Sequence, residues 1–131
     1  MIEPEPVAPA APLRIAIVDD EVMLLRVLER YLSLHGHQVE IFESPTTFLT
    51  TWPDPKGYDL VLLDICMPHM NGLELLDVMS TKAKNLPRIV IISGYDCTGR
   101  LPQELRNRRV SFLPKPFRME ALVNLIHNQA P

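Results

Sequence analysis

The sequence contains little cysteine: Cys66 and Cys97 are the only two among its 131 residues. Two cysteines do not make a disulfide framework, and their spacing matches no zinc motif, so we expect reduced thiols. The sequence also lacks an apolar run long enough to span a bilayer and a signal-peptide pattern at its start. Its net charge of −3 gives no general attraction to nucleic acid or to an anionic membrane. These absences favour a cytoplasmic protein without direct DNA binding and without a membrane span.

Prolines are concentrated at the start of the chain. Pro4, Pro6, Pro9 and Pro12 are interspersed with Glu, Val and Ala residues, and such a composition favours an extended chain that cannot form a core. We therefore predict a disordered proline-rich tail or linker over residues 1–12 and one folded domain over residues 13–131. The length of the folded part is sufficient for a single domain with its own core.

The remainder alternates short apolar runs with segments of helical periodicity. The predicted strands cover residues 14–18, 38–42, 60–63, 88–92 and 110–113. The predicted helices cover residues 22–34, 45–52, 73–84, 103–109 and 119–128. Pro68 and the pair Asn71-Gly72 predict a turn after the third strand. Five consecutive strand–helix repeats predict an α/β fold, in which a parallel sheet has helices on both faces.

Polar residues follow the predicted strands directly. Asp19 and Asp20 follow the first strand, Asp64 the third, Ser93 the fourth and Lys115 the fifth. The carboxyl ends of parallel strands share one edge of the sheet, where open α/β folds bind ligands. A carboxylate in this place is a candidate nucleophile or metal ligand. Helix capping explains one acid of the run that begins at Asp19, whereas a bound cation explains the three together.

Four motifs contain these residues: Ile-Val-Asp-Asp-Glu, Leu-Leu-Asp-Ile-Cys-Met-Pro-His-Met-Asn-Gly, Ile-Ile-Ser-Gly-Tyr and Leu-Pro-Lys-Pro-Phe. Their order and spacing resemble those of response-regulator receiver domains over about residues 13–129. Asp64 lies 45 residues after Asp19, Ser93 lies 29 residues after Asp64, and Lys115 lies a further 22 residues on. The resemblance implies the flavodoxin-like (βα)5 fold of the chemotaxis regulators, a three-layer sandwich with strand order 2-1-3-4-5.

By this resemblance, Asp64 is the phosphoacceptor of a two-component or phosphorelay system. It takes a phosphoryl group from a phosphohistidine on a histidine kinase or a histidine phosphotransfer protein. The implied ligands of Mg²⁺ (or Mn²⁺) are Asp19, Asp20, Asp64 and the backbone carbonyl of Cys66. Lys115 would offset the phosphoryl charge, and its bond to the following proline is expected to be cis. Such a chain is a signalling phosphoacceptor rather than an enzyme, and it catalyses only its own phosphorylation and dephosphorylation.

The resemblance also implies a switch that couples Ser93 to Phe112, the aromatic residue three positions before the lysine. Ser93 would donate its hydroxyl to the phosphoryl group and move toward it. Phe112 would then turn inward behind it and change the partner-binding surface. The alternative for Phe112 is an ordinary aromatic core residue.

Other classes of function stay open. A receiver-like binding scaffold that works without phosphorylation would keep these residues without their chemistry. A magnesium-dependent aspartyl-phosphate hydrolase of the haloacid-dehalogenase type requires Asp-x-Asp, whereas this chain has Asp64-Ile65-Cys66. A flavodoxin requires a Gly/Ser/Thr-rich phosphate loop, which does not follow the first strand. The sequence fits a stand-alone regulator or a receiver excised from a longer regulator or a hybrid histidine kinase, and in the last case the parent protein would be a kinase.

Two positions set the phosphoryl lifetime in the family that this chain resembles, and here they are Cys66 and Tyr95. Neither side chain is an acid or amide that would orient an attacking water, so we predict a moderately long-lived phosphoryl group. Cys66→Asn and Tyr95→Glu should each shorten its half-life, measured as the loss of phosphorylated protein with time. An unchanged half-life in both variants would refute this prediction.

Overall fold

The structure, a computed structural model, describes residues 12–68, 70–94 and 110–127. These residues include a parallel sheet of five strands in the order β2-β1-β3-β4-β5. The strands are β1 (Arg14–Val18), β2 (Gln38–Phe42), β3 (Leu60–Asp64), β4 (Arg88–Ser93) and β5 (Val110–Pro114). The predicted strand order 2-1-3-4-5 is therefore confirmed.

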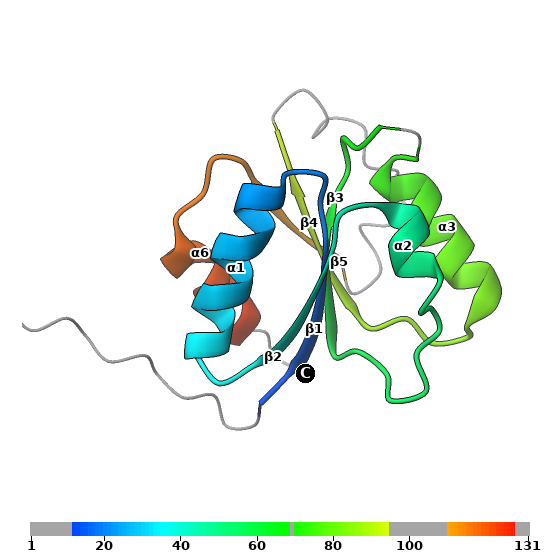
Figure 1. The fold of residues 1–131 in the computed structure, drawn as a ribbon, viewed down its shortest axis with the longest axis horizontal. Coiled ribbons are helices and arrows are strands. Elements are labelled where there is room, and N and C mark those ends of the chain that lie inside the picture. The colour runs from blue at the N-terminus through cyan, green and yellow to red at the C-terminus, as the bar shows by residue number, and fades with distance from the viewer. Residues whose placement is uncertain (1–11, 69, 95–109, 128–131) are drawn as a thin grey trace, which may run out of the picture.

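Helices cover both faces of this sheet. They are α1 (Val22–Leu34), α2 (Pro45–Leu49), α3 (Gly72–Lys82) and α6 (Met119–His127). Helices α1 and α6 lie on one face, and α2 and α3 lie on the other (Figure 1). The predicted three-layer α/β sandwich is thus confirmed. The tail predicted up to residue 12 and the helix predicted at 103–109 fall mostly or wholly outside the described residues.

Each central strand is apolar on both faces because helices cover both. In β1, Ala16 packs into the cluster on the α2–α3 side, whereas Ile15 and Ile17 pack into the cluster beneath α1 and α6. Successive side chains of a strand point to opposite faces, so one short apolar run contributes to two cores. The strands are therefore fixed from both sides, and so are their carboxyl ends. Within the described residues, none of the helices has the length and apolar character that crossing a bilayer requires.

Helix α2 ends at Leu49, earlier than the predicted end near Trp52. The hydroxyls of Thr50 and Thr51 each donate to a backbone carbonyl three residues back. Such local side-chain bonds compete with helical backbone bonding. Pro53 also disfavours a helical conformation at the residue before it. The helical periodicity of the sequence does not reveal these local bonds.

The Asn71-Gly72 pair begins α3 instead of forming the predicted turn. The Asn71 side chain accepts a hydrogen bond from the N–H of Glu74 at 2.8 Å, and the Glu74 carboxylate accepts one from the N–H of Asn71 at 3.2 Å. Gly72 donates its N–H to the carbonyl of Ile65 at 3.0 Å. A Cβ at Gly72 would lie 2.7 Å from the backbone oxygen of Asp64. Glycine therefore lets α3 start directly against the end of β3.

Gly72→Ala should lower the free energy of unfolding by about 1–3 kcal/mol, because the added methyl group must displace the backbone at Asp64. Urea unfolding would measure this difference. Gly94→Ala is the matched control, since a Cβ there meets nothing within 4 Å, and it should change stability by less than about 0.5 kcal/mol. Equal stability of Gly72→Ala and wild type would contradict the close contact.

Candidate functional site

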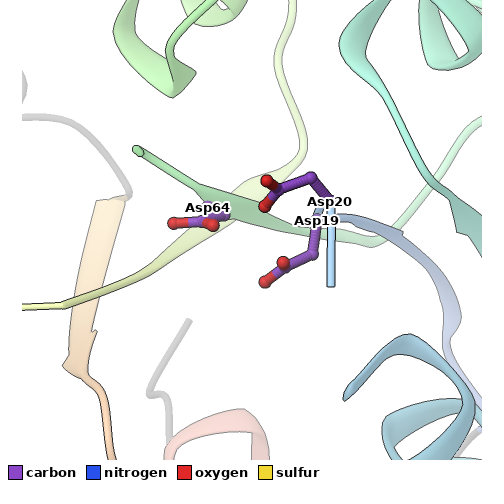
Figure 2. A group of neighbouring side chains, drawn as sticks. All are labelled: Asp19, Asp20 and Asp64. Carbon is purple, nitrogen blue, oxygen red and sulfur yellow. The ribbon is translucent and has the colours of Figure 1, made fainter. Parts of the chain in front are cut away.

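Three carboxylates meet at the carboxyl-end edge of the sheet. Asp19 and Asp20 follow β1, and Asp64 ends β3, which is the neighbouring strand. One carboxylate oxygen from each lies within 4.8 Å of the others. Figure 2 shows that the three side chains extend to the same side of the strand ends. The structure therefore brings together three residues that are as far as 45 positions apart in the sequence.

Two of these acids are buried and oriented by the backbone. Asp19 and Asp64 are only 0% and 3% exposed, whereas Asp20 is exposed. The N–H of Glu21 donates to Oδ1 of Asp19 at 2.9 Å, and the N–H of Cys66 donates to Oδ1 of Asp64 at 3.1 Å. Each contact spans two residues, as in an Asx turn. The second oxygen of each carboxylate is thereby directed toward the other groups of the site.

Helix capping does not account for these acids. Glu21 is the N-cap residue of α1, and no side-chain capping bond from it is found among the described residues. Asp19 and Asp20 lie outside the helix end. The capping alternative for the acidic run is therefore wrong, because the chain enters α1 only after the second aspartate.

Lys115 provides the positive charge of the site. Its Nζ donates to Oδ2 of Asp19 and to Oε1 of Glu21, both at 3.0 Å, and to Oδ2 of Asp64 at 3.5 Å. Its peptide bond to Pro116 is cis, as the resemblance implies. Burial disfavours the ammonium, but its bonds to Asp19 and Glu21 outweigh this effect and raise the pKa of Lys115 above its usual range. Lys115 therefore stays charged.

Glu21 is a residue of the site that the sequence reasoning did not assign. It is the third acid of Asp-Asp-Glu, and that run was the available signal. Its side chain is mostly exposed and reaches Lys115 from the start of α1. The contact depends on β5 ending close enough to the β1–α1 junction, which residue spacing alone does not show.

The site holds more negative charge than Lys115 can balance. Burial and the nearby charge of Asp19 raise the pKa of the Asp64 carboxyl to about 6. Lys115 and the N–H of Cys66 oppose this rise. Burial likewise raises the pKa of Asp19, although Lys115 and the N–H of Glu21 oppose it. Excess negative charge away from water is the condition that a bound cation relieves.

The donors of the site fit a hard divalent cation. Carboxylate oxygens are the ligands that Mg²⁺ prefers, and Asp19, Asp20 and Asp64 supply them within a small volume. The fourth predicted ligand is the backbone carbonyl of Cys66, which stays a prediction. The N–H of Cys66 holds this loop beside Asp64. The chain can thus supply a cation with several oxygen ligands.

For the other predicted site residues, the structure supports a position in the fold but tests no role. Ser93 is the last residue of β4, directly after the register partner of Asp64 on that strand. Phe112 of β5 is half-buried and packs against the core cluster on the α2–α3 side. Strand β4 is next to β3 and β5 is next to β4, but the switching roles of Ser93 and Phe112 stay predictions. Tyr95 lies outside the described residues.

Cys66 corrects one expectation. It is exposed and disulfide-bonded, so the expectation of reduced thiols is wrong for this residue. Cys97 lies outside the described residues. The spacing of cysteines along the chain does not show which of them come within bonding distance, so no feature of the sequence predicts this disulfide.

A hollow of about 440 Å³ opens beside the charged cluster, next to the start of α1 and the start of α6. It is lined by Glu21, Leu24, Lys115, Pro116, Phe117 and Met119. Glu21 and Lys115 also belong to the charged cluster, and the other side chains of the lining are apolar. A partner that fills this hollow would contact Lys115.

Asp64→Asn should raise the free energy of unfolding in the absence of a divalent cation. The raised pKa of Asp64 means that its ionisation opposes folding as pH rises from the ordinary value of 3.8 to about 6. The gain should therefore grow over this range and reach roughly 1–3 kcal/mol above it. Urea unfolding from pH 5 to pH 8 measures it. Asp77→Asn, at an exposed position on α3, is the matched control. An equal gain in stability in Asp77→Asn, or no gain in Asp64→Asn, would contradict the prediction.

Comparison with known proteins agrees with this geometry. The family model of the response regulator receiver domain matches residues 15–127. The response regulator MprA of Mycobacterium sp. (strain KMS) is 31% identical over 112 residues, which are 86% of this chain and 48% of MprA. The chain thus spans about half the length of this relative.

Two solved structures extend the likeness to three dimensions. The CheY-like receiver domain protein of Methanospirillum hungatei JF-1 is 26% identical, has a TM-score of 0.73, and the match covers 88% of this chain and 91% of that one. The receiver domain of the hybrid histidine kinase CckA is 26% identical, has a TM-score of 0.70, and the match covers 86% and 94%. With the strand order and the acidic site, these matches show that the chain belongs to the response regulator receiver domain family of two-component signalling.

Proposed function

We propose that Asp64 accepts a phosphoryl group from a phosphohistidine of a partner protein, with Mg²⁺ (or Mn²⁺) bound beside it. The observation that carries this proposal is the meeting of three carboxylates with the Nζ of Lys115 at one edge of the sheet. A nucleophile, oxygen ligands for a cation and a fixed positive charge are the parts that phosphoryl transfer needs. The family membership supports the same function.

In this reaction an oxygen of Asp64 attacks the phosphorus, and the bond between phosphorus and the histidine nitrogen breaks. The donor histidine, which carries a proton on its other ring nitrogen, leaves as neutral imidazole, and Asp64 becomes an acyl phosphate. The attack requires the ionised carboxylate, and the pKa of about 6 leaves Asp64 mostly ionised at neutral pH. The N–H of Cys66 orients this carboxylate through Oδ1. Its Oδ2, which faces Lys115, is the oxygen available for attack.

The divalent cation would supply charge neutralisation for the incoming anion. Asp19, Asp20, Asp64 and the carbonyl of Cys66 are the residues proposed to hold it. Lys115 would exchange its contacts with Asp19 and Glu21 for contacts with the phosphoryl oxygens. A compact ammonium on a flexible stem suits such an exchange.

The proposed output is a change of surface driven by Ser93 and Phe112. Ser93 ends β4 next to the end of β3, so its hydroxyl would donate to a phosphoryl group on Asp64. Phe112 lies on the adjoining strand β5 and is half-buried, so part of it is exposed and would become covered on moving inward. The phosphorylated and unphosphorylated forms would then present different surfaces to a downstream protein.

The proposed phosphoryl donor is a histidine kinase or a histidine phosphotransfer protein, since response regulators interact with such kinases. The hollow lined partly by Lys115 gives the donor a place to contact the chain. One similar structure is the receiver of a hybrid histidine kinase, so a parent protein of that kind fits as well as a separate regulator. We propose a cytoplasmic setting for the chain, as the absence of a predicted membrane span favours.

The test is the intact mass of the protein after incubation with acetyl phosphate and Mg²⁺. Wild type should gain one phosphoryl unit, because Asp64 is a nucleophile with a cation site beside it. Asp64→Ala should gain none, and removal of Mg²⁺ by EDTA should abolish the gain in wild type.

Asp77→Ala is the matched control, because it removes an exposed acid on α3 and leaves the site intact. It should gain the same unit as wild type. Folded wild type that gains no mass would instead support the scaffold that works without phosphorylation. A gain that persists in Asp64→Ala would place the acceptor elsewhere.

A further inference from the structure

Histidines from three parts of the chain gather at the end of the sheet opposite to the acidic site. His35 ends α1, His37 precedes β2, and His127 is the last residue of α6. The ring centroids of His37 and His127 are 5.4 Å apart, and those of His35 and His127 are 6.5 Å apart. In Figure 1 the end of α1, the start of β2 and the end of α6 lie at the same end of the molecule, where β1 also begins.

The hydrogen bonds of His37 fix where its proton lies. Its Nδ1 accepts the backbone N–H of Leu13 at 3.1 Å. A ring nitrogen that accepts carries no proton, so neutral His37 has its proton on Nε2. That Nε2 lies 3.2 Å from Nε2 of His127. His37 therefore donates this bond, and His127 accepts it and keeps its own proton on Nδ1.

Both bonds require a neutral pair. A proton added to His37 goes to Nδ1, where it faces the N–H of Leu13. A proton added to His127 goes to Nε2, where it faces the N–H of His37. Either event places donor against donor and breaks one of the two contacts. We propose that His37 and His127 form an acid-sensitive latch, which joins the entry of β1 to the end of α6 while neutral and opens when protonated.

The tautomer of His37 argues against a metal site at this pair. A histidine that binds a metal through one nitrogen normally donates a proton from the other. In His37 the other nitrogen, Nδ1, instead accepts a hydrogen bond from the backbone N–H of Leu13. The two Nε2 atoms thus meet as donor and acceptor. His35 is engaged separately, because its Nδ1 donates to the carbonyl of Tyr31 at 2.9 Å.

The charged surroundings of the latch also favour the neutral state. His35 lies beside it on the α1 side. From β4, the guanidinium of Arg88 donates to the carbonyls of Leu125 and Ile126, at the end of α6. Among the described residues, no carboxylate raises the pKa of His37 or of His127. A proton added to His37 or His127 would therefore be repelled by the positively charged groups nearby.

The direction of the pH dependence follows. Burial lowers the pKa of His37, and the charges of His127 and His35 lower it further; burial and His35 lower the pKa of His127. In the unfolded chain both titrate near the ordinary value of about 6.5. Below that value the unfolded chain binds more protons than the folded one, so protonation favours opening. The contribution of the latch is full above about pH 6.5 and is lost as pH falls through the lower folded values.

Opening would release the entry of β1 and the end of α6 at the same time. Leu13 directly precedes β1, and His127 is the last residue of α6. The latch thus gives this end of the sheet a response to acid that is separate from phosphorylation at the other end.

Amide hydrogen exchange followed by NMR tests the latch on the full chain. Between pH 7.5 and pH 5, the protection factor of the Leu13 amide should fall by up to about tenfold for each pH unit below about 6.5, until the lower folded midpoint is reached. In His37→Asn, the side-chain oxygen replaces Nδ1 as acceptor and does not titrate, so Leu13 should stay protected. His127→Gln offers the same replacement at Nε2 and should reduce the pH dependence if the first variant does not fold.

Three further experiments test whether the pH-dependent loss of Leu13 protection comes from His37 and His127. His35→Asn is the matched control and should retain the pH-dependent loss. Asp64→Asn removes a distant group that titrates near pH 6 and should also retain it. Constant protection of Leu13 in wild type, or the same loss in His37→Asn, would overturn the latch. Added Zn²⁺ at pH 7.5 should leave the Leu13 resonance in place; a shift that disappears in His127→Gln would establish a metal site instead.

Discussion

The site depends on one charged contact, the ammonium of Lys115 placed among carboxylates that the fold has removed from water. Asp19 is fully buried and its Oδ2 lies 3.0 Å from Nζ of Lys115. Without a cation, burying two acids side by side would be costly, because each charge loses its hydration and repels the other. A single lysine offsets only part of this charge. The remaining negative charge is what the proposed divalent cation would offset, and the proposed transfer of a phosphoryl anion depends on that neutralisation.

This contact exists because the sheet is held from both sides. The carboxyl ends of β1, β3 and β5 belong to strands that two helical layers fix in position. The start of α3 adds a further constraint, since Gly72 lets the helix touch the backbone of Asp64 and Asn71 caps it there. Asp64, the proposed nucleophile, therefore lies at a rigid strand end. The flexible groups of the site are the long side chains of Lys115 and Glu21.

Burial acts on the two ends of the sheet in opposite senses. At the carboxyl end it raises the pKa of Asp64, because the charged form of an acid is disfavoured away from water. At the other end it lowers the pKa of His37, because for a base the charged form is the protonated one. The same desolvation thus favours neutrality at both ends. A bound cation would offset the negative charge at the carboxyl end, whereas at the other end an added proton is disfavoured.

The sequence by itself determined the strands, their parallel order through the family resemblance, and the acids and lysine at the strand ends. These follow from local patterns: apolar runs mark buried strands, and a polar residue after such a run lies at the edge of the sheet. The tertiary structure decided the early end of α2, the helical start at Asn71, the contact of Glu21 with Lys115 and the disulfide of Cys66. It also decided the pairing of His37 with a histidine 90 positions later. Each of these depends on which atoms of distant segments come within bonding distance, and periodicity along a chain carries no information about that.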